Sequence, residues 1–305
     1  MTGPTITERL WARFTAPQPL VRLELIRILV PALVLLFLSS RMAHVDDWIG
    51  TAGFHVPDLG RADYRQPLFV PPLAPLVARG LISLLVASGL GLAAGAWTRI
   101  SGALFTASLL YVDLADRLSE FTVSKLGVVL ALALTLSPAG AALSVDALRR
   151  GGPAMRLVSA GYVRAFQLLI VVFYLGSGIA KWRGDWPFGD VIWSQIHDSY
   201  QTVVAYGLAK VLPAWSWPTF QLVTLVYEAG APIWFFAPAT RPFALAYGLA
   251  MHLMIGLMFG PLIWFSLLMM SLLVACFAPA TWLEHVTSRF ARGAPATDRS
   301  GRSSA

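Results

Sequence analysis

Cysteine and charge are both scarce in this chain of 305 residues. A single cysteine, Cys276, excludes an intramolecular disulfide, a CxxC redox pair and a metal site with several thiolate ligands. Charged residues make up only 13% of the sequence, whereas soluble domains carry about 25%. The shortage of charge therefore excludes an ordinary soluble protein. The sequence also has no Walker, GxSxG, HExxH or nucleotide-binding glycine motif.

Apolar residues are abundant instead, at 57% of the chain. Several mostly apolar runs reach about 17 residues or more, which suffices to cross about 30 Å of hydrocarbon. We therefore expect an all-α protein, a polytopic integral membrane helix bundle of about eight transmembrane helices. The expected spans are residues 24–40, 77–96, 100–114, 121–137, 162–181, 219–238, 243–259 and 262–279.

The distribution of arginine predicts how the bundle is oriented. An arginine bias in short loops marks the cytoplasmic side, and this bias favours cytoplasmic N- and C-termini. We expect a multi-pass protein of a bacterial cytoplasmic (inner) membrane whose basic side meets anionic lipid headgroups. The membrane location accounts for the basic composition, so no nucleic-acid partner is expected.

Three segments follow from this outline. Residues 1–20 form an interfacial cytoplasmic segment, in which Thr5 and Glu8 have the spacing of a helix-capping box. Residues 21–280 form the transmembrane domain, with a tryptophan-rich outer loop at 182–218. The basic segment 281–305 is expected to be disordered.

The motif richest in chemical possibilities ends the fifth expected span. Tyr174, Ser177, Gly178 and Lys181 are spaced so that they share one helix face. Lysine is rare here, with three among 23 basic residues, and an ionisable residue in an apolar span indicates a functional site. Desolvation would prepare Lys181 to act as a general base. The alternative is an interfacial lysine that reaches lipid headgroups.

Aromatic residues follow directly after this lysine. The segment from Trp182 to Trp217 holds five of the eleven tryptophans, including Trp186. An aromatic belt at the membrane interface accounts for most of them. The second interpretation is a lid over a pocket for a planar apolar ligand such as a quinone, with Tyr174, Ser177, Gly178, Trp182 and Trp186 as the binding residues.

Two further polar residues, Glu228 and His252, lie near the middle of the sixth and seventh expected spans. A charge at the centre of a span costs about 2.5–3.5 kcal/mol on the insertion scale. Because these spans are adjacent and antiparallel, the two side chains are expected to pair. A buried proton site and a structural hydrogen bond both fit this pattern. Five scattered histidines and one cysteine predict no tight metal site.

Several of these residues together resemble a known family. The run Tyr174, Gly178, Lys181, Asp185-Trp186 and Gly189 resembles the lysine-containing segment of vitamin K-dependent gamma-glutamyl carboxylase and of the broader HTTM (horizontally transferred transmembrane) domain family. Glu228, Arg241, His252 and Leu143-Ser-Val-Asp-Ala-Leu148 also occur in matching order, and the resemblance covers roughly residues 20–280. It implies that Lys181 deprotonates a hydroquinone and that His252 lines the same cavity.

The chain also departs from that family. It has Thr122-Val123 where the carboxylase has an asparagine–histidine pair, and no counterpart of the large lumenal substrate domain is expected. The resemblance therefore implies the hydroquinone half of the mechanism rather than carboxylation of a docked protein.

Two functional hypotheses follow. The first is a membrane oxidoreductase or modifying enzyme that acts on a quinone-like or lipid-soluble substrate at the outer face. In this hypothesis Lys181 is the base, and Glu228 and His252 are proton-relay groups. The alternative is a non-catalytic membrane partner for peptide export, maturation or immunity, which contacts a membrane or exported protein. A transporter is the weakest option, because no inverted repeat is visible.

Overall fold

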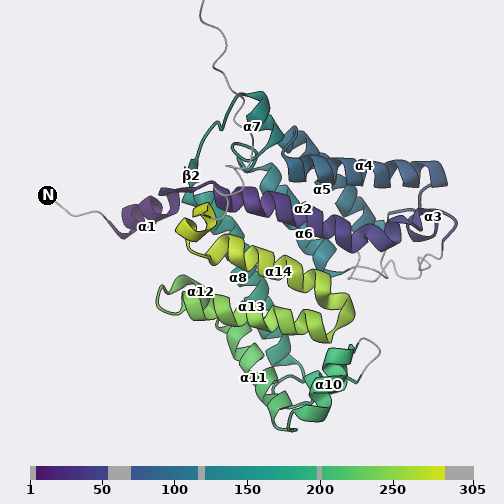
Figure 1. Ribbon diagram of the computed structural model, residues 1–305, viewed down its shortest axis with the longest axis vertical. Helices are drawn as coiled ribbons and strands as arrows, with labels where there is room; N and C mark the ends of the chain where they lie inside the picture. Colours follow the sequence, from purple (N-terminus) through teal and green to yellow (C-terminus); the bar gives the residue numbers. More distant parts are fainter. Residues whose placement is uncertain (1–4, 54–69, 116–120, 198–200, 286–305) are drawn as a thin grey trace, which may run out of the picture.

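Helices make up almost all of the regular structure in the computed structural model, which describes residues 5–53, 70–115, 121–197 and 201–285 (Figure 1). The all-α prediction is therefore confirmed, and every expected span overlaps one or two helices. The corresponding helices are α2 (Val21–Met42), α4 (Pro75–Ala94), α5 (Thr98–Ala115), α6 (Thr122–Thr135), α8 (Ala160–Arg183), α11 (Ser216–Ala229) with α12 (Ala231–Phe236), α13 (Arg241–Met258) and α14 (Ile263–Phe277).

Shorter elements connect these helices. They are α1 (Ile6–Thr15), β1 (Pro17–Pro19), α3 (Val45–Trp48), α7 (Val145–Arg149), β2 (Leu157–Ser159), α9 (Val191–Gln195), α10 (Val203–Val211) and the 3₁₀ turn η1 (Gly260–Leu262). The strands β1 and β2 pair antiparallel, so the chain enters α2 and α8 from the same place. The capping box is confirmed at the start of α1, where Thr5 N–H donates to Glu8 at 2.7 Å and Glu8 N–H donates to Thr5 Oγ1 at 3.3 Å.

Within the part of the chain that the structure describes, four segments are both long and apolar enough to cross a membrane: α4, α8, α13 and the segment Gly260–Phe277. These helices fit an integral membrane protein. The shorter apolar helix α6 also lies in the bundle. The expected number of eight spans and the orientation of the termini stay predictions.

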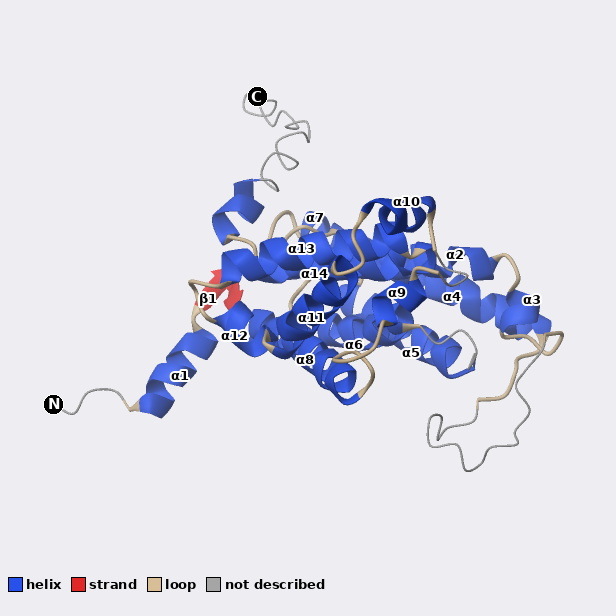
Figure 2. Ribbon diagram, turned by 90° about the horizontal axis from the view of Figure 1, so that it is seen from below, coloured by secondary structure: helices blue, strands red, loops and turns tan. Residues whose placement is uncertain are grey.

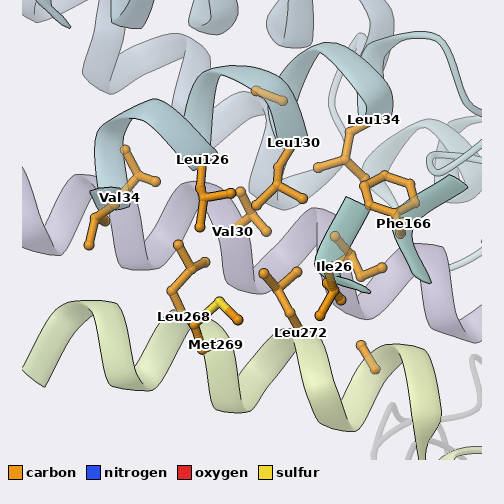
Figure 3. Close-up of a cluster of buried hydrophobic side chains, with 14 of the residues drawn as sticks. Ile26, Val30, Val34, Leu126, Leu130, Leu134, Phe166, Leu268, Met269 and Leu272 are labelled. Atoms are coloured by element: carbon orange, nitrogen blue, oxygen red, sulfur yellow. The ribbon is translucent and has the colours of Figure 1, made fainter. Parts of the chain in front are cut away.

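The long helices pack in a row in the order α5, α4, α2, α14 and α13, and α6 packs against both α5 and α2. Helix α8 crosses this row obliquely and contacts α2, α14 and α11 (Figure 1). Both views place α1 and α3 at opposite ends of the bundle (Figure 2). Figure 3 shows the core between α2, α6 and α14, where Val30, Leu130 and Leu268 meet.

A fully buried ion pair fixes one end of this arrangement. Glu24 and Arg27 lie one turn apart on α2 with no exposed side-chain surface, and Arg27 Nη2 donates to Glu24 at 2.9 Å. Arg27 also donates to the backbone carbonyl groups of Leu92 at 2.8 Å and Ala139 at 2.9 Å. Glu24 accepts the Ala142 N–H at 2.9 Å. The pair thus joins α2 to the end of α4 and to the connection that follows α6.

Asp146 of α7 joins the end of α4 to the start of α5 at the same end of the bundle. Its carboxylate accepts the N–H groups of Trp97 and Thr98, both at 2.9 Å, at the start of α5. The N–H of Asp146 donates to the carbonyl of Gly95 at 3.0 Å. Gly95 ends α4 with a φ of +69°, and an added Cβ would lie 2.7 Å from Arg27 Nη1. Only glycine meets both demands without strain.

The sixth expected span, 219–238, is not one helix. Helix α11 ends at Ala229, and α12 begins at Ala231 after a break at Gly230. Pro232 explains the break, because it has no N–H to donate to the carbonyl of Glu228 and its ring would clash with that carbonyl in a continuous helix. The prediction of an uninterrupted span was therefore wrong at this position.

The expected disordered tail at 281–305 also differs in its first residues, because 280–285 are helical. The rest of that segment, 286–305, lies outside the described residues. Helix α4 begins at Pro75, two residues before the expected start at Val77. Proline is well suited to the first turn of a helix, where its missing N–H has no intrahelical partner to lose.

Replacing Arg27 with methionine is expected to lower the free energy of unfolding by about 3–5 kcal/mol, because Glu24 would stay buried without its counter-charge. Reversible unfolding in mixed micelles measures the loss. Arg99→Met is the control, since Arg99 is exposed on α5, which lies beyond α4 from Arg27. Equal stability of the two variants would contradict this structural role for Arg27.

The contribution of Asp146 is expected to depend on pH. Burial alone would raise the pKa of Asp146, but the hydrogen bonds from Thr98 and Trp97 outweigh this and lower the pKa below its ordinary value. A carboxylate whose pKa is lowered by folding stabilises the fold when the pH is above its ordinary pKa of about 4. This stabilisation is lost as the pH falls through the lowered pKa. The difference in Tm between wild type and Asp146→Asn should thus be constant from pH 7 to 5 and shrink below about pH 4. A difference that stays unchanged down to pH 3 would contradict it.

Candidate functional site

The candidate site lies along one face of α8. Tyr174, Ser177, Gly178 and Lys181 follow one another on this face over two turns, with Lys181 near the end of the helix. Each of the four contacts another polar group or a neighbouring helix. The face is turned toward α11 and α13, which supply Glu228 and His252.

Lys181 and Glu228 form an ion pair across α8 and α11. The Lys181 ammonium donates to both carboxylate oxygens, at 2.5 Å to Oε1, and to Ser177 Oγ at 3.1 Å. The side chain of Lys181 is 21% exposed, whereas that of Glu228 is 7% exposed. The Glu228 side chain is thus nearly closed off, whereas the Lys181 side chain keeps limited access to its surroundings. The pair is neutral as a whole, which lowers the cost of its burial.

Gly178 allows this ion pair to form. A Cβ built on Gly178 would lie 2.6 Å from the Ala229 nitrogen and 3.0 Å from the Glu228 carbonyl carbon. These are backbone atoms, so no side-chain movement could make room. Glycine therefore lets α8 and α11 touch backbone to backbone, as small residues do between membrane helices. The sequence predicts Gly178 among the residues that bind a planar ligand; in the structure the backbone of α11 lies against it.

An aromatic ring covers the ammonium. Lys181 Nζ lies 4.7 Å from the centroid of the Trp186 ring, which is a cation–π geometry. The loop that carries Trp186 is held by Gln221 of α11, whose amide donates to the carbonyl of Trp186 and, at 2.7 Å, to that of Gly189. The Gln221 oxygen accepts the Ile192 N–H at 3.1 Å. Gln221 therefore positions the tryptophan over the lysine.

Tyr174 and His252 form a second polar contact, two helical turns from Lys181. Tyr174 Oη and His252 Nε2 share a hydrogen bond of 2.6 Å, and both side chains are buried. His252 Nδ1 is buried and has no hydrogen-bond partner among the described residues. The expected pairing of Glu228 with His252 was therefore wrong, because Glu228 binds Lys181 and His252 binds Tyr174.

Aromatic packing connects the two polar contacts. Tyr227 is the chain neighbour of Glu228, and its ring meets that of Tyr174 edge-on at 5.4 Å between centroids. Phe235 of α12 stacks on Tyr174 at 5.9 Å and also lies 6.0 Å from the Tyr227 ring. Tyr227 Oη donates to the Ala244 carbonyl at 3.0 Å and so reaches α13. The break at Gly230 brings Phe235 back toward α8 and completes this aromatic cluster.

The tryptophan-rich loop, expected at 182–218, contains the helices α9 and α10 rather than irregular chain. Ile196, Ala205, Trp217 and Met258 form its small buried core. Trp182, by contrast, is 65% exposed on the last turn of α8. Of the two tryptophans expected at the binding site, only Trp186 lies against Lys181.

Sequence reasoning missed two sets of polar residues. Gln221 is a lone amide within an apolar helix, and this isolation was the signal that could have identified it. Glu24 and Arg27 are oppositely charged residues one turn apart at the start of the first apolar run.

Among the described residues, no three histidine, cysteine or carboxylate side chains come together as a metal site. A cavity of about 680 Å³ lies at the other end of α8, lined by its first two turns.

A model of the HTTM domain family matches residues 17–282 of the chain. This match covers every residue of the candidate site, from Tyr174 to His252. No curated protein and no solved structure matches the chain.

Gly178→Ala is expected to separate α8 from α11 and weaken the ion pair, because the added methyl group meets backbone. Overpacking of this kind costs about 1–3 kcal/mol. Thermal unfolding in detergent measures the change. Gly176→Ala is the matched control on the same helix, since a Cβ there has no neighbour within 4 Å, and alanine should stabilise the helix by up to about 1 kcal/mol. Equal effects of the two substitutions would show that the close approach at Gly178 is unimportant.

Proposed function

Because the chain belongs to the HTTM domain family, we propose that it is a membrane enzyme in which Lys181 removes a proton from a hydroxyl group of a lipid-soluble, quinol-like substrate. The observation that carries this proposal is the half-open ion pair of Lys181 and Glu228. The side chain of Lys181 is 21% exposed and that of its partner Glu228 only 7%. A substrate can thus reach the lysine, while the carboxylate stays behind it as a proton acceptor.

The proton balance follows from this arrangement. In the resting pair the lysine is cationic and the glutamate anionic. Transfer of one proton from Lys181 Nζ to Glu228, over the contact of 2.5 Å, gives a neutral amine and a neutral carboxylic acid. In a medium of low dielectric constant a neutral pair competes well with an ion pair. The amine then takes the hydroxyl proton of the substrate, and the restored ammonium lies beside the substrate oxyanion.

The surroundings of Lys181 suit an aromatic substrate in part. Trp186 lies against the ammonium, and exposed Trp182 follows Lys181 in the chain. Ser177 Oγ orients the amine through its hydrogen bond. Tyr174 and Gly178 are closed off by neighbouring helices, so they support the site from behind. Tyr174 and His252 lie behind it, where their hydrogen bond is a candidate end point for a proton relay.

The orientation of the protein is part of the proposal. With eight spans and cytoplasmic termini, as the arginine bias predicts, α8 would run from the cytoplasmic side toward the outer side of a bacterial inner membrane. Lys181 would then meet substrate that arrives from the bilayer toward the outer leaflet. The resemblance to the carboxylase supports the role of Lys181, since the end of α8 resembles its lysine-containing segment.

A second function is favoured by the exposed aromatic residues near the same end of α8. Phe188 is 98% exposed and Trp215 is 68% exposed. Exposed apolar groups of this kind are found at protein contacts, so a non-catalytic partner for an exported peptide or a companion protein is the alternative. In that case the ion pair would be purely structural. A Lys181→Arg variant would then keep full function in the host, because arginine retains the charge although it cannot serve as a base.

The test compares Lys181→Met with the double variant Lys181→Met/Glu228→Met. The single variant leaves a buried carboxylate unpaired and should lose both stability and activity. The double variant removes both charges and should regain stability but not activity. Activity is measured as deprotonation of an isoprenyl naphthohydroquinone in proteoliposomes without oxygen. The phenolate that forms is detected by its red-shifted absorption. A neighbouring cation changes a pKa by about 1–3, so loss of Lys181 should lower the phenolate fraction by at least about tenfold.

Mass spectrometry of solvent extracts complements this measurement. A quinone that co-purifies with the wild-type protein at one molecule per chain, and is absent from the double variant, would support the proposal. A double variant as active as wild type would overturn it and leave the ion pair with a structural role. Lys210→Met serves as the control, because Lys210 belongs to α10 and lies over the Tyr206 ring, away from Glu228.

A further inference from the structure

The cavity of about 680 Å³ lies where α8 and α13 begin and α14 ends, beside the strand β1. It is separate from the candidate site, since Lys181 lies at the other end of α8. Three arginines line it from three different helices: Arg22 of α2, Arg164 of α8 and Arg241 of α13. Among the described residues that line the cavity, none is aspartate or glutamate.

Arg22 is the most buried of the three, with 7% of its surface exposed. Two of its donors are used by α14, because Nη1 donates to the Ala275 carbonyl at 2.8 Å and Nη2 to the Ala278 carbonyl at 2.7 Å. Its Nε–H is buried and has no partner among the described residues. An unsatisfied donor on a cation is costly in a buried site, which points to an acceptor from a bound molecule.

The other two arginines are held at the cavity wall and keep donors in reserve. Arg241 Nε donates to the Phe235 carbonyl at 2.9 Å, and Arg164 Nη1 donates to Gln167 at 3.2 Å. Gln167 is fixed in turn by its hydrogen bond of 2.7 Å to the Cys276 carbonyl. Each guanidinium has five N–H donors, so these contacts orient the groups and leave most of their donors for a ligand.

Charge balance leads to the same conclusion. Three cations around one cavity repel one another, and the effect grows as water is excluded. Buried charges are otherwise paired, as Lys181 and Arg27 are in this protein. Guanidinium groups match phosphate with two parallel hydrogen bonds, so a phosphate group is the counter-charge that fits this set.

The rest of the cavity wall is apolar. Val163, Leu245, Leu249 and Phe277 line it, together with the exposed residues Pro242 and Ala246 on α13. Because α13 is long and apolar enough to cross a membrane, its exposed face has access to lipid. A ligand with a phosphate and an apolar chain would match both parts of the wall.

We propose that this cavity binds a phosphate-bearing anion, held by Arg22, Arg164 and Arg241, with the phosphate of an anionic lipid headgroup as one source and a soluble phosphate compound as the other. The site lies away from Lys181 and would operate whether or not the protein is an enzyme. In the fold it would join the starts of α2, α8 and α13.

Native mass spectrometry on delipidated protein tests the lipid source, with phosphatidylglycerol compared with phosphatidylcholine. Arg164→Gln and Arg241→Gln each remove one guanidinium group from the cavity and should weaken phosphatidylglycerol binding by at least about tenfold. Arg22 is left intact because it joins α2 to α14. Arg156→Gln is the matched control, since Arg156 is exposed and precedes β2 but does not line the cavity; it should bind like wild type.

Thermal unfolding with pyrophosphate, against sodium chloride of equal ionic strength, tests the soluble source. Saturable stabilisation that is lost in Arg164→Gln and Arg241→Gln, without selective binding of phosphatidylglycerol, would support the site and assign it to a soluble anion. The proposal is overturned if both lipids bind equally and pyrophosphate has no effect beyond that of salt. It is also overturned if Arg156→Gln weakens binding as much as the two cavity variants do.

Discussion

The guanidinium of Arg27 is buried without any exposed surface and bonded to the end of α4, to Glu24 on its own helix and to the connection after α6. Within an apolar bundle such a charge is stable only when each of its donors finds an oxygen. Three separate parts of the chain must therefore take their positions together. The tight glycine end of α4 lies directly beside the guanidinium, and the Asp146 cap of α5 is joined to it, because the Asp146 N–H donates to the Gly95 carbonyl.

Charge is handled differently along α8. At its far end the Lys181–Glu228 pair is neutral but only partly enclosed, and an indole ring rather than a carbonyl covers the ammonium. At its near end Arg22 and Arg241 donate to backbone carbonyls and Arg164 donates to Gln167, yet no carboxylate is among the described lining residues. The fold thus contains a fully buried guanidinium at Arg27, a partly exposed ion pair at Lys181 and Glu228, and an arginine cluster without a carboxylate. These sites differ in how accessible their side chains are. A fully buried charge has a structural role, whereas an accessible one can bind a ligand.

Much of the fold could be predicted from the sequence, because apolar periodicity and helix caps are local properties. The helical segments, the capping box at Thr5 and the common face of Tyr174 and Lys181 are of this kind. The partner of Glu228 was not predictable in the same way, since it depends on the oblique path of α8 past α11 and on a break caused by Pro232. The role of Gln221 was not predictable for a related reason: the lone amide stands out in an apolar helix, but its partners are backbone groups, which carry no signal in the sequence.

The contact between Arg22 and the end of α14 also bears on how the chain is made. Arg22 donates to the carbonyl of a residue 253 positions later. At a synthesis rate of about 5–20 residues per second, that acceptor emerges about 13–51 s after the arginine. Until then Arg22 on α2 lacks the carbonyl groups that accept its hydrogen bonds in the folded protein. Its guanidinium must meanwhile interact with lipid headgroups or with the insertion machinery. Helix α14 therefore completes the contacts of α2, and a chain that stops before α14 would leave Arg22 without these two acceptors.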